Sequence, residues 1–326
     1  MRQQGCRFPD LSFKHQQHRL PEISRGMFTF SRLLVTGRDR SRFLHNFCTN
    51  DVRSLPAGQL IEAFFTDVKA RILAHGYILA FESHHEILLP AADAEPLQKH
   101  LDRYIITEDV SVTLSPGLQT HIFSCDPPAP ALTALAEAVT EQTGACRSLE
   151  TAGGSLTVLT FAWNQRRLCA ICGPEAAMQA VKADALPGLL TEPELQVLRI
   201  RERFPIVGID LTNEHLAPEA DRNSTAICFT KGCYLGQEPI ARIDALGHIN
   251  KALRCLVIAA NDTVALPADA PIRNPEGTSV GLLTSAARND HESIVGLAVI
   301  RLAAAEQPGL VADNHGLLLP VSSVNA

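Results

Sequence analysis

The chain alternates short apolar segments with polar turns, and the spacing of the apolar residues indicates a mixed helix and strand protein. Strand-like runs rich in Phe, Ile, Leu and Val occur at residues 28–35, 60–66, 72–81, 86–89, 110–114, 155–162 and 167–172. Helix-like spacing occurs at residues 39–47, 94–104, 132–139, 174–183 and 195–203. Pro116-Gly117 predicts the end of the strand at 110–114. The order of strand, helix and strand recurs, so we expect two α+β units.

After Asn250 the sequence pattern changes and predicts short strands separated by prolines and glycines. These strands lie at residues 253–259, 280–284, 294–300 and 316–321. Such a pattern is typical of a small β-barrel. The predicted organisation is therefore an N-terminal tail at residues 1–26, a body at 27–250 and a barrel at 251–326.

Composition and charge limit the classes of protein to which this chain can belong. The 326 residues are 46% hydrophobic and 20% charged, which is ordinary for folded domains. A net charge of −6 argues against a broad grip on nucleic acid, and no apolar run approaches the roughly 20 residues that span a bilayer. Nine scattered cysteines suit reduced thiols in a cytoplasmic protein. The basic N-terminal residues leave an organellar transit peptide open, which would indicate the mitochondrial matrix.

The octapeptide KGCYLGQE at residues 231–238 places Cys233 between two glycines. Gly232 and Gly236 give the loop backbone freedom, and Pro239 suits the first turn of a following helix. A thiol near a helix N-terminus and close to Lys231 would be favoured as a nucleophilic or metal-ligating thiolate. The alternative is a buried cysteine in a tight turn, and spacing alone leaves both interpretations open.

Other candidate groups carry weaker signals. Cys169 and Cys172 lie three apart in a predicted strand, which sends them to opposite faces, and no second close pair completes a metal site. We therefore predict no metal centre. Arg199 and Arg203 lie one turn apart on a predicted helix, where they form either an exposed charged face or guanidinium clamps for a carboxylate-bearing ligand.

The octapeptide, followed by Ala241-Arg242, resembles the signature of the YgfZ family. Further resemblance lies in RFLHNFCTNDV at residues 42–52, LRIR at 198–201 and VGLLTS at 280–285, so that it spans about residues 26–321. Members of this family are relatives of the glycine-cleavage T-protein, an aminomethyltransferase; they bind tetrahydrofolate and support the assembly or repair of iron-sulfur clusters. The resemblance implies a T-protein-like ring of two α+β lobes plus a C-terminal β-barrel around a folate cavity.

The resemblance also implies roles for individual residues. Cys233 would be the functional thiol, and Lys231 and Gln237 would shape its loop. The candidate pocket residues for tetrahydrofolate are Asn50, Asp51, Arg199 and Arg242. The implied partners are folate and iron-sulfur client enzymes or their assembly machinery.

Two departures from the aminomethyltransferase pattern limit this transfer. Those enzymes carry an acidic pair on the strand where this chain has Ala74-His75, so the expected catalytic carboxylate is missing. They also carry a folate-binding glutamate at the position that Arg201 takes here, with Glu202 one residue away.

The leading hypothesis is a tetrahydrofolate-binding accessory factor for iron-sulfur enzymes that acts through Cys233 and is not a functional aminomethyltransferase. One alternative is a tetrahydrofolate-dependent methyl or aminomethyl transferase. The other is a scaffold protein that has lost folate.

Overall fold

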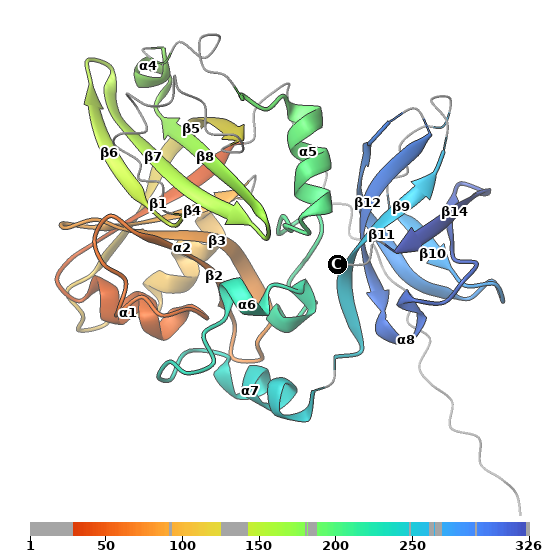
Figure 1. Ribbon diagram of the computed structural model, residues 1–326. Helices are drawn as coiled ribbons and strands as arrows, with labels where there is room; N and C mark the ends of the chain where they lie inside the picture. The colour runs from red at the N-terminus through yellow and green to blue at the C-terminus, as the bar shows by residue number, and fades with distance from the viewer. Residues whose placement is uncertain are drawn as a thin grey trace, which may run out of the picture.

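Eight strands form one antiparallel sheet in the order β2-β3-β4-β1-β5-β8-β7-β6 (Figure 1). The computed structural model describes residues 29–90, 93–124, 143–179, 181, 188–247, 249–260, 264, 269–290 and 292–323. The strands are β1 (Phe30–Thr36), β2 (Leu60–Thr66), β3 (Ile72–Ala80), β4 (His85–Pro90), β5 (Ser111–Ser124), β6 (Cys146–Thr151), β7 (Gly154–Trp163) and β8 (Arg166–Gly173). The predicted meander of β2, β3 and β4 is confirmed.

Helices cover this sheet in two places. Helices α1 (Arg40–Phe47) and α2 (Glu95–Asp102) pack Phe43, Leu44 and Leu97 into one core with β1 to β4. The short helix α4 (Glu175–Met178) packs on the other half, against β7. The predicted helix at 174–183 is thus shorter, while its residues 180, 182 and 183, the predicted helix at 132–139 and the tail at 1–26 lie outside the described residues.

The strand β5 joins the two halves of the sheet. Its first part, through Leu118, pairs with β1, and its second part, from Gln119, pairs with β8. The predicted strand end at Pro116-Gly117 is wrong, because the extra residue there is absorbed as a bulge opposite Phe30 and Arg32. A bulge removes the need for a ladder hydrogen bond that proline cannot donate.

A six-stranded closed barrel follows in the order β10-β11-β12-β9-β14-β13. Its strands are β9 (Lys251–Ala259), β10 (Ala270–Arg273), β11 (Ser279–Arg288), β12 (Ser293–Arg301), β13 (Val311–Asn314) and β14 (Leu317–Ser323), and α8 (Leu302–Ala305) follows β12. The sequence pattern missed β10 and β13, whose pairing closes the barrel. The structure confirms the predicted α+β class with a C-terminal barrel.

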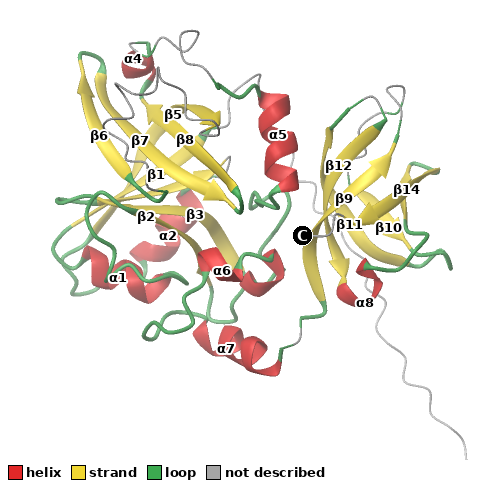
Figure 2. Ribbon diagram, viewed as in Figure 1, coloured by secondary structure: helices red, strands yellow, loops and turns green. Residues whose placement is uncertain are grey.

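Helix α5 (Glu192–Arg201) stands between the sheet and the barrel (Figure 2). Leu195 enters the core of the second half-sheet, whereas Ile200 packs with residues such as Leu253 and Leu297 on the outer face of the barrel. Below it, the short helices η3 (Ala217–Ala220) and α6 (Asn223–Ala226) lead to the octapeptide and then to α7 (Gln237–Leu246). This path carries the octapeptide back to α1 and β2.

Candidate functional site

Residues 231–236, called here the thiol loop, are fixed by a buried lysine. Lys231 is 8% exposed, and its Nζ donates to the carbonyl oxygens of His45, Cys48 and Asn50 at 2.6, 2.8 and 2.7 Å. The ammonium also lies 4.8 Å from the centroid of the Tyr234 ring. Burial lowers the pKa of Lys231, while these carbonyl dipoles and the aromatic face supply contacts that favour its cation.

The same loop caps the C-terminus of α1. The last carbonyls of a helix have no partner within it. Here Lys231 bonds to the His45 carbonyl, and the Leu235 N–H donates to the Asn46 carbonyl at 2.9 Å. The loop and the helix end therefore satisfy each other's backbone groups.

Gly236 is required where the loop turns into α7. Its φ is +83°, and a Cβ atom there would lie 2.5 Å from the carbonyl oxygen of Asp67. Next to it, Thr66 donates its hydroxyl to the Leu235 carbonyl at 2.8 Å. A larger residue at 236 would push the loop away from β2.

Cys233 is exposed, and it is the one exposed cysteine within the described residues. The Lys231 ammonium donates its hydrogen bonds to the carbonyls of His45, Cys48 and Asn50, not to the thiol. By contrast, Cys169 and Cys172 are buried in the cores on opposite faces of β8, as the spacing predicts. Burial raises the pKa of Cys172 to about 12, which suits a packing role.

Asn50 and Asp51 lie beside the thiol loop. The Asn50 amide donates to the carbonyls of Glu62 and Thr225 at 2.8 and 3.0 Å. The Asp51 carboxylate accepts from the N–H groups of residues 53 and 54 and lies 3.1 Å from His45 Nδ1. The structure thus brings Asn50, Asp51, Lys231 and Cys233 into one region.

The two arginines predicted for the pocket lie elsewhere. Arg199 is buried between α5 and the barrel, with Nη1 2.6 Å from Asp210 Oδ2 and Nη2 2.9 Å from Ser285 Oγ. Arg242 is exposed on α7, where it pairs with Glu238, and Gln237 is the first residue of that helix. The guanidinium of Arg199 is therefore engaged in holding the barrel.

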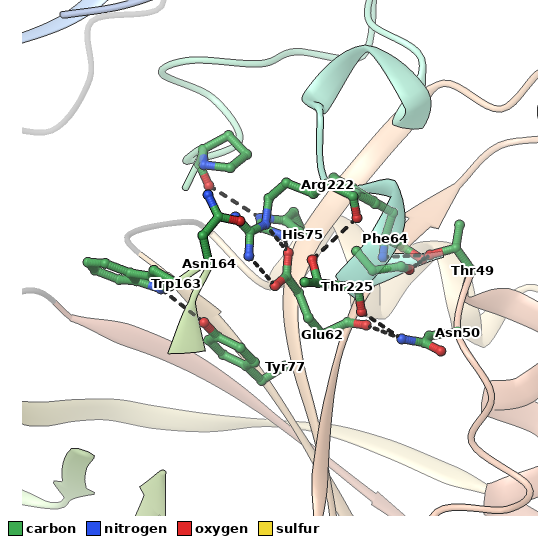
Figure 3. A network of polar contacts seen from close by, with 12 residues as sticks. Thr49, Asn50, Glu62, Phe64, His75, Tyr77, Trp163, Asn164, Arg222 and Thr225 are labelled. Carbon is green, nitrogen blue, oxygen red and sulfur yellow. Dashed lines mark hydrogen bonds and ion pairs between the residues drawn. The ribbon is translucent and has the colours of Figure 1, made fainter. Parts of the chain in front are cut away.

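A buried carboxylate cluster, missed by the sequence analysis, lies on the β2–β3 face (Figure 3). Glu62 bonds to Nε and Nη2 of Arg222, the latter at 2.6 Å, and lies 2.7 Å from His75 Nε2. Phe64 and Phe204 flank the His75 ring with centroids 4.5 and 4.8 Å away. The missed signal was a single acid inside the apolar strand LIEAFFT.

The Glu62 carboxylate lies beside His75, which is on the strand where this chain has Ala74-His75 in place of an acidic pair. Burial alone would raise the pKa of Glu62, but Arg222 and then His75 bring it down to about 2. Glu62 is therefore ionised and paired at neutral pH. The side chains of Arg201 and Glu202 do not join the cluster: Arg201 bonds to Asn289, and the Glu202 carboxylate accepts from the Gln165 N–H at 3.2 Å. The Glu202 backbone carbonyl does accept from Arg222 Nη1 at 3.5 Å.

Comparisons with known proteins identify relatives of the chain. A protein named tRNA-modifying protein YgfZ from Colwellia psychrerythraea is 25% identical over 229 residues, 70% of this chain and 69% of its own. Its namesake from Yersinia enterocolitica is 27% identical over 244 residues, 72% and 71% of the two chains. These likenesses support assignment of the chain to the YgfZ family.

The fold of this protein is that of the glycine-cleavage aminomethyltransferase. The crystal structure of the glycine cleavage system aminomethyltransferase T from Bartonella henselae matches with a TM-score of 0.73 at 16% identity, over 91% of this chain and 83% of that one. No family model matches the chain. Within the described residues there is no helix long and apolar enough to cross a membrane, and no group of three or more His, Cys, Asp or Glu suited to a metal ion.

Lys231→Met tests the anchor of the thiol loop. It keeps an apolar stem but leaves three carbonyls without their donor, which costs about 2–4 kcal/mol in the free energy of unfolding. Hydrogen exchange should speed up at the Leu235 amide, and urea unfolding should show the loss. Lys69→Met, in the exposed turn after β2, is the control. Equal exchange in both variants would contradict the anchor.

The Glu62 cluster predicts a dependence of stability on pH. The folded-state pKa of about 2 lies below the ordinary 4.5, so the stabilisation is complete above about pH 5 and lost as the pH falls toward 2. Urea unfolding from pH 7 to 3 should show a loss on the order of 2 kcal/mol that Glu62→Gln removes. If the single variant is too unstable, Glu62→Gln with Arg222→Met removes both charges. If the free energies of unfolding of wild type and variant changed equally with pH, the prediction would be wrong.

Proposed function

We propose that this protein is a tetrahydrofolate-binding accessory factor that helps assemble or repair iron-sulfur clusters in client enzymes, acting through Cys233. The observation that carries the proposal is an exposed thiol on a loop held by buried contacts. Such a loop presents sulfur to another molecule in a fixed position.

The chemistry of a thiol suits this role. Thiolates are the usual ligands of iron in iron-sulfur clusters, and a thiol can also carry sulfur as a persulfide. The described residues supply no second and third ligand beside Cys233. A cluster or sulfur atom would therefore be a cargo shared with a client, which completes the ligand set.

The names of the relatives point to tRNA modification, whereas the net charge of −6 disfavours a broad contact with tRNA. We infer that the connection is indirect, through client enzymes that contain iron-sulfur clusters and modify tRNA. This keeps the partner a protein.

The Glu62 cluster suits a reduced pterin better than the four residues first named for the pocket. A pterin needs an acceptor for the donor N–H groups of its amino-pyrimidinone edge and flat faces for stacking, and Glu62 with Phe64 and Phe204 offers both. Arg222 now presents the same arrangement of donors to Glu62. Pterin binding there requires Arg222 to leave the carboxylate, and the exposed Arg242 is a candidate for the anionic glutamyl tail.

A complementation experiment tests the thiol. Cys233→Ala should fold with an unchanged melting temperature but fail to restore the activity of iron-sulfur enzymes in a strain that lacks this protein. Cys228→Ala, five residues earlier and partly buried, is the matched control and should restore it. Full rescue by Cys233→Ala would remove the thiol from the function.

Calorimetric titration with tetrahydrofolate tests the pocket separately. Wild type and Cys233→Ala should bind alike, because the thiol lies outside the carboxylate cluster. Glu62→Gln should weaken binding about tenfold or more, since a charged acceptor is lost. Absence of binding to wild type would favour the scaffold alternative, and formation of methylene-tetrahydrofolate from an aminomethyl-lipoyl carrier would favour the transferase.

A further inference from the structure

A histidine and an aspartate lie beside the thiol loop; Asp51 was predicted as a pocket residue, whereas no role was predicted for His45. His45, in the last turn of α1, has a side chain 6% exposed. Its Nδ1 lies 3.1 Å from Asp51 Oδ1. Asp51 is itself held by Ser54, whose hydroxyl donates to Oδ2 at 2.7 Å.

The other nitrogen of the ring faces the thiol loop. A Cβ atom built on Gly232 would lie 3.7 Å from His45 Nε2, and Gly232 directly precedes Cys233. Within the described part of the chain Nε2 has no hydrogen-bond partner. An almost fully buried ring thus aims an unpartnered nitrogen at the backbone next to the thiol.

One contact sets the register of the two groups. The carbonyl oxygen of His45 accepts from Lys231 Nζ at 2.6 Å, two residues before Cys233. Because the backbone of His45 and the loop share this bond, the lysine anchor holds the His45 backbone beside the loop. The absence of a side chain at Gly232 leaves the space between them open.

The charges around His45 favour a neutral ring. Burial is the largest effect that lowers the pKa of His45, Lys231 and Arg53 lower it further, and Asp51 opposes them. In the tautomer that carries its proton on Nδ1, 3.1 Å from Asp51 Oδ1, the neutral ring keeps a free lone pair on Nε2. That tautomer is a proton acceptor.

We propose that His45 accepts the proton of Cys233 and that Asp51 positions it. The proton passes from Sγ to Nε2, leaving a thiolate and an imidazolium whose positive charge lies beside the Asp51 carboxylate, with Nδ1 3.1 Å from Oδ1. No other reactant is needed. The inference rests on the proposed function for its purpose, since it names how that thiol becomes a nucleophile or ligand, but its test needs no client and no folate.

The experiment measures alkylation of Cys233 by iodoacetamide, in which the S–C bond forms and iodide leaves. Rates are read by peptide mass spectrometry on the full chain between pH 6 and pH 10. At pH 7 we expect His45→Gln to slow the reaction about fivefold or more, since only the thiolate reacts. Asp51→Asn should slow it less. His84→Gln, on a turn at the start of β4, should leave it unchanged.

The rate at pH 10 separates proton transfer from a packing role. There the thiol loses its proton without help, so wild type and His45→Gln should react equally if the loop is intact. An equal loss at every pH would show that His45 only shapes the loop, and no loss at pH 7 would show that it takes no proton. Either result overturns the proposal, whereas the proposed function depends on Cys233→Ala alone.

Discussion

The thiol loop depends on one buried ammonium that bonds to three carbonyl oxygens. Lys231 reaches the end of α1 from more than 180 residues away in the sequence. Desolvating a lysine is costly, so the contact persists only because the helix end supplies carbonyls that would otherwise lack donors. An apolar residue could fill the same space, but it would satisfy none of them. The lysine thus fixes where Cys233 can be.

Two further buried cations join distant segments in the same way. Arg222 bonds to Glu62 on β2, and Arg199 bonds to Asp210 and the barrel strand β11. Buried ion pairs contribute little net stability, because desolvation offsets their attraction, yet breaking one is costly. Their effect here is to exclude other arrangements of the segments that they join. Each pair fixes a place where the sheet, the loops and the barrel meet.

The sequence predicted the helices and strands that have strong apolar patterns. It did not predict features that depend on contacts between segments far apart in the chain. The strand at residues 60–66 was predicted to the residue, because its apolar run is bounded by turn residues. The bulge at Pro116 was missed, since only the partner strand shows that a ladder bond can be spared there. The capping role of Lys231 was equally hidden, because a lysine in a glycine-rich loop shows no sign of a helix end far away in the sequence. For the same reason Glu62 was counted as one residue of a strand.

The thiol loop and the carboxylate cluster meet at Asn50. Its carbonyl accepts from Lys231, while its side-chain amide donates to the backbone of Glu62 and of Thr225, three residues after Arg222. A movement of Arg222 away from Glu62 would strain the backbone at residue 225, and through Asn50 it would reach the lysine anchor. Occupation of the carboxylate by another ligand therefore has a short path of bonded groups to Cys233. The ionised Glu62 is neutralised by Arg222 where it stands, whereas the Cys233 thiol is exposed, so the thiol is the group of this region left open to react.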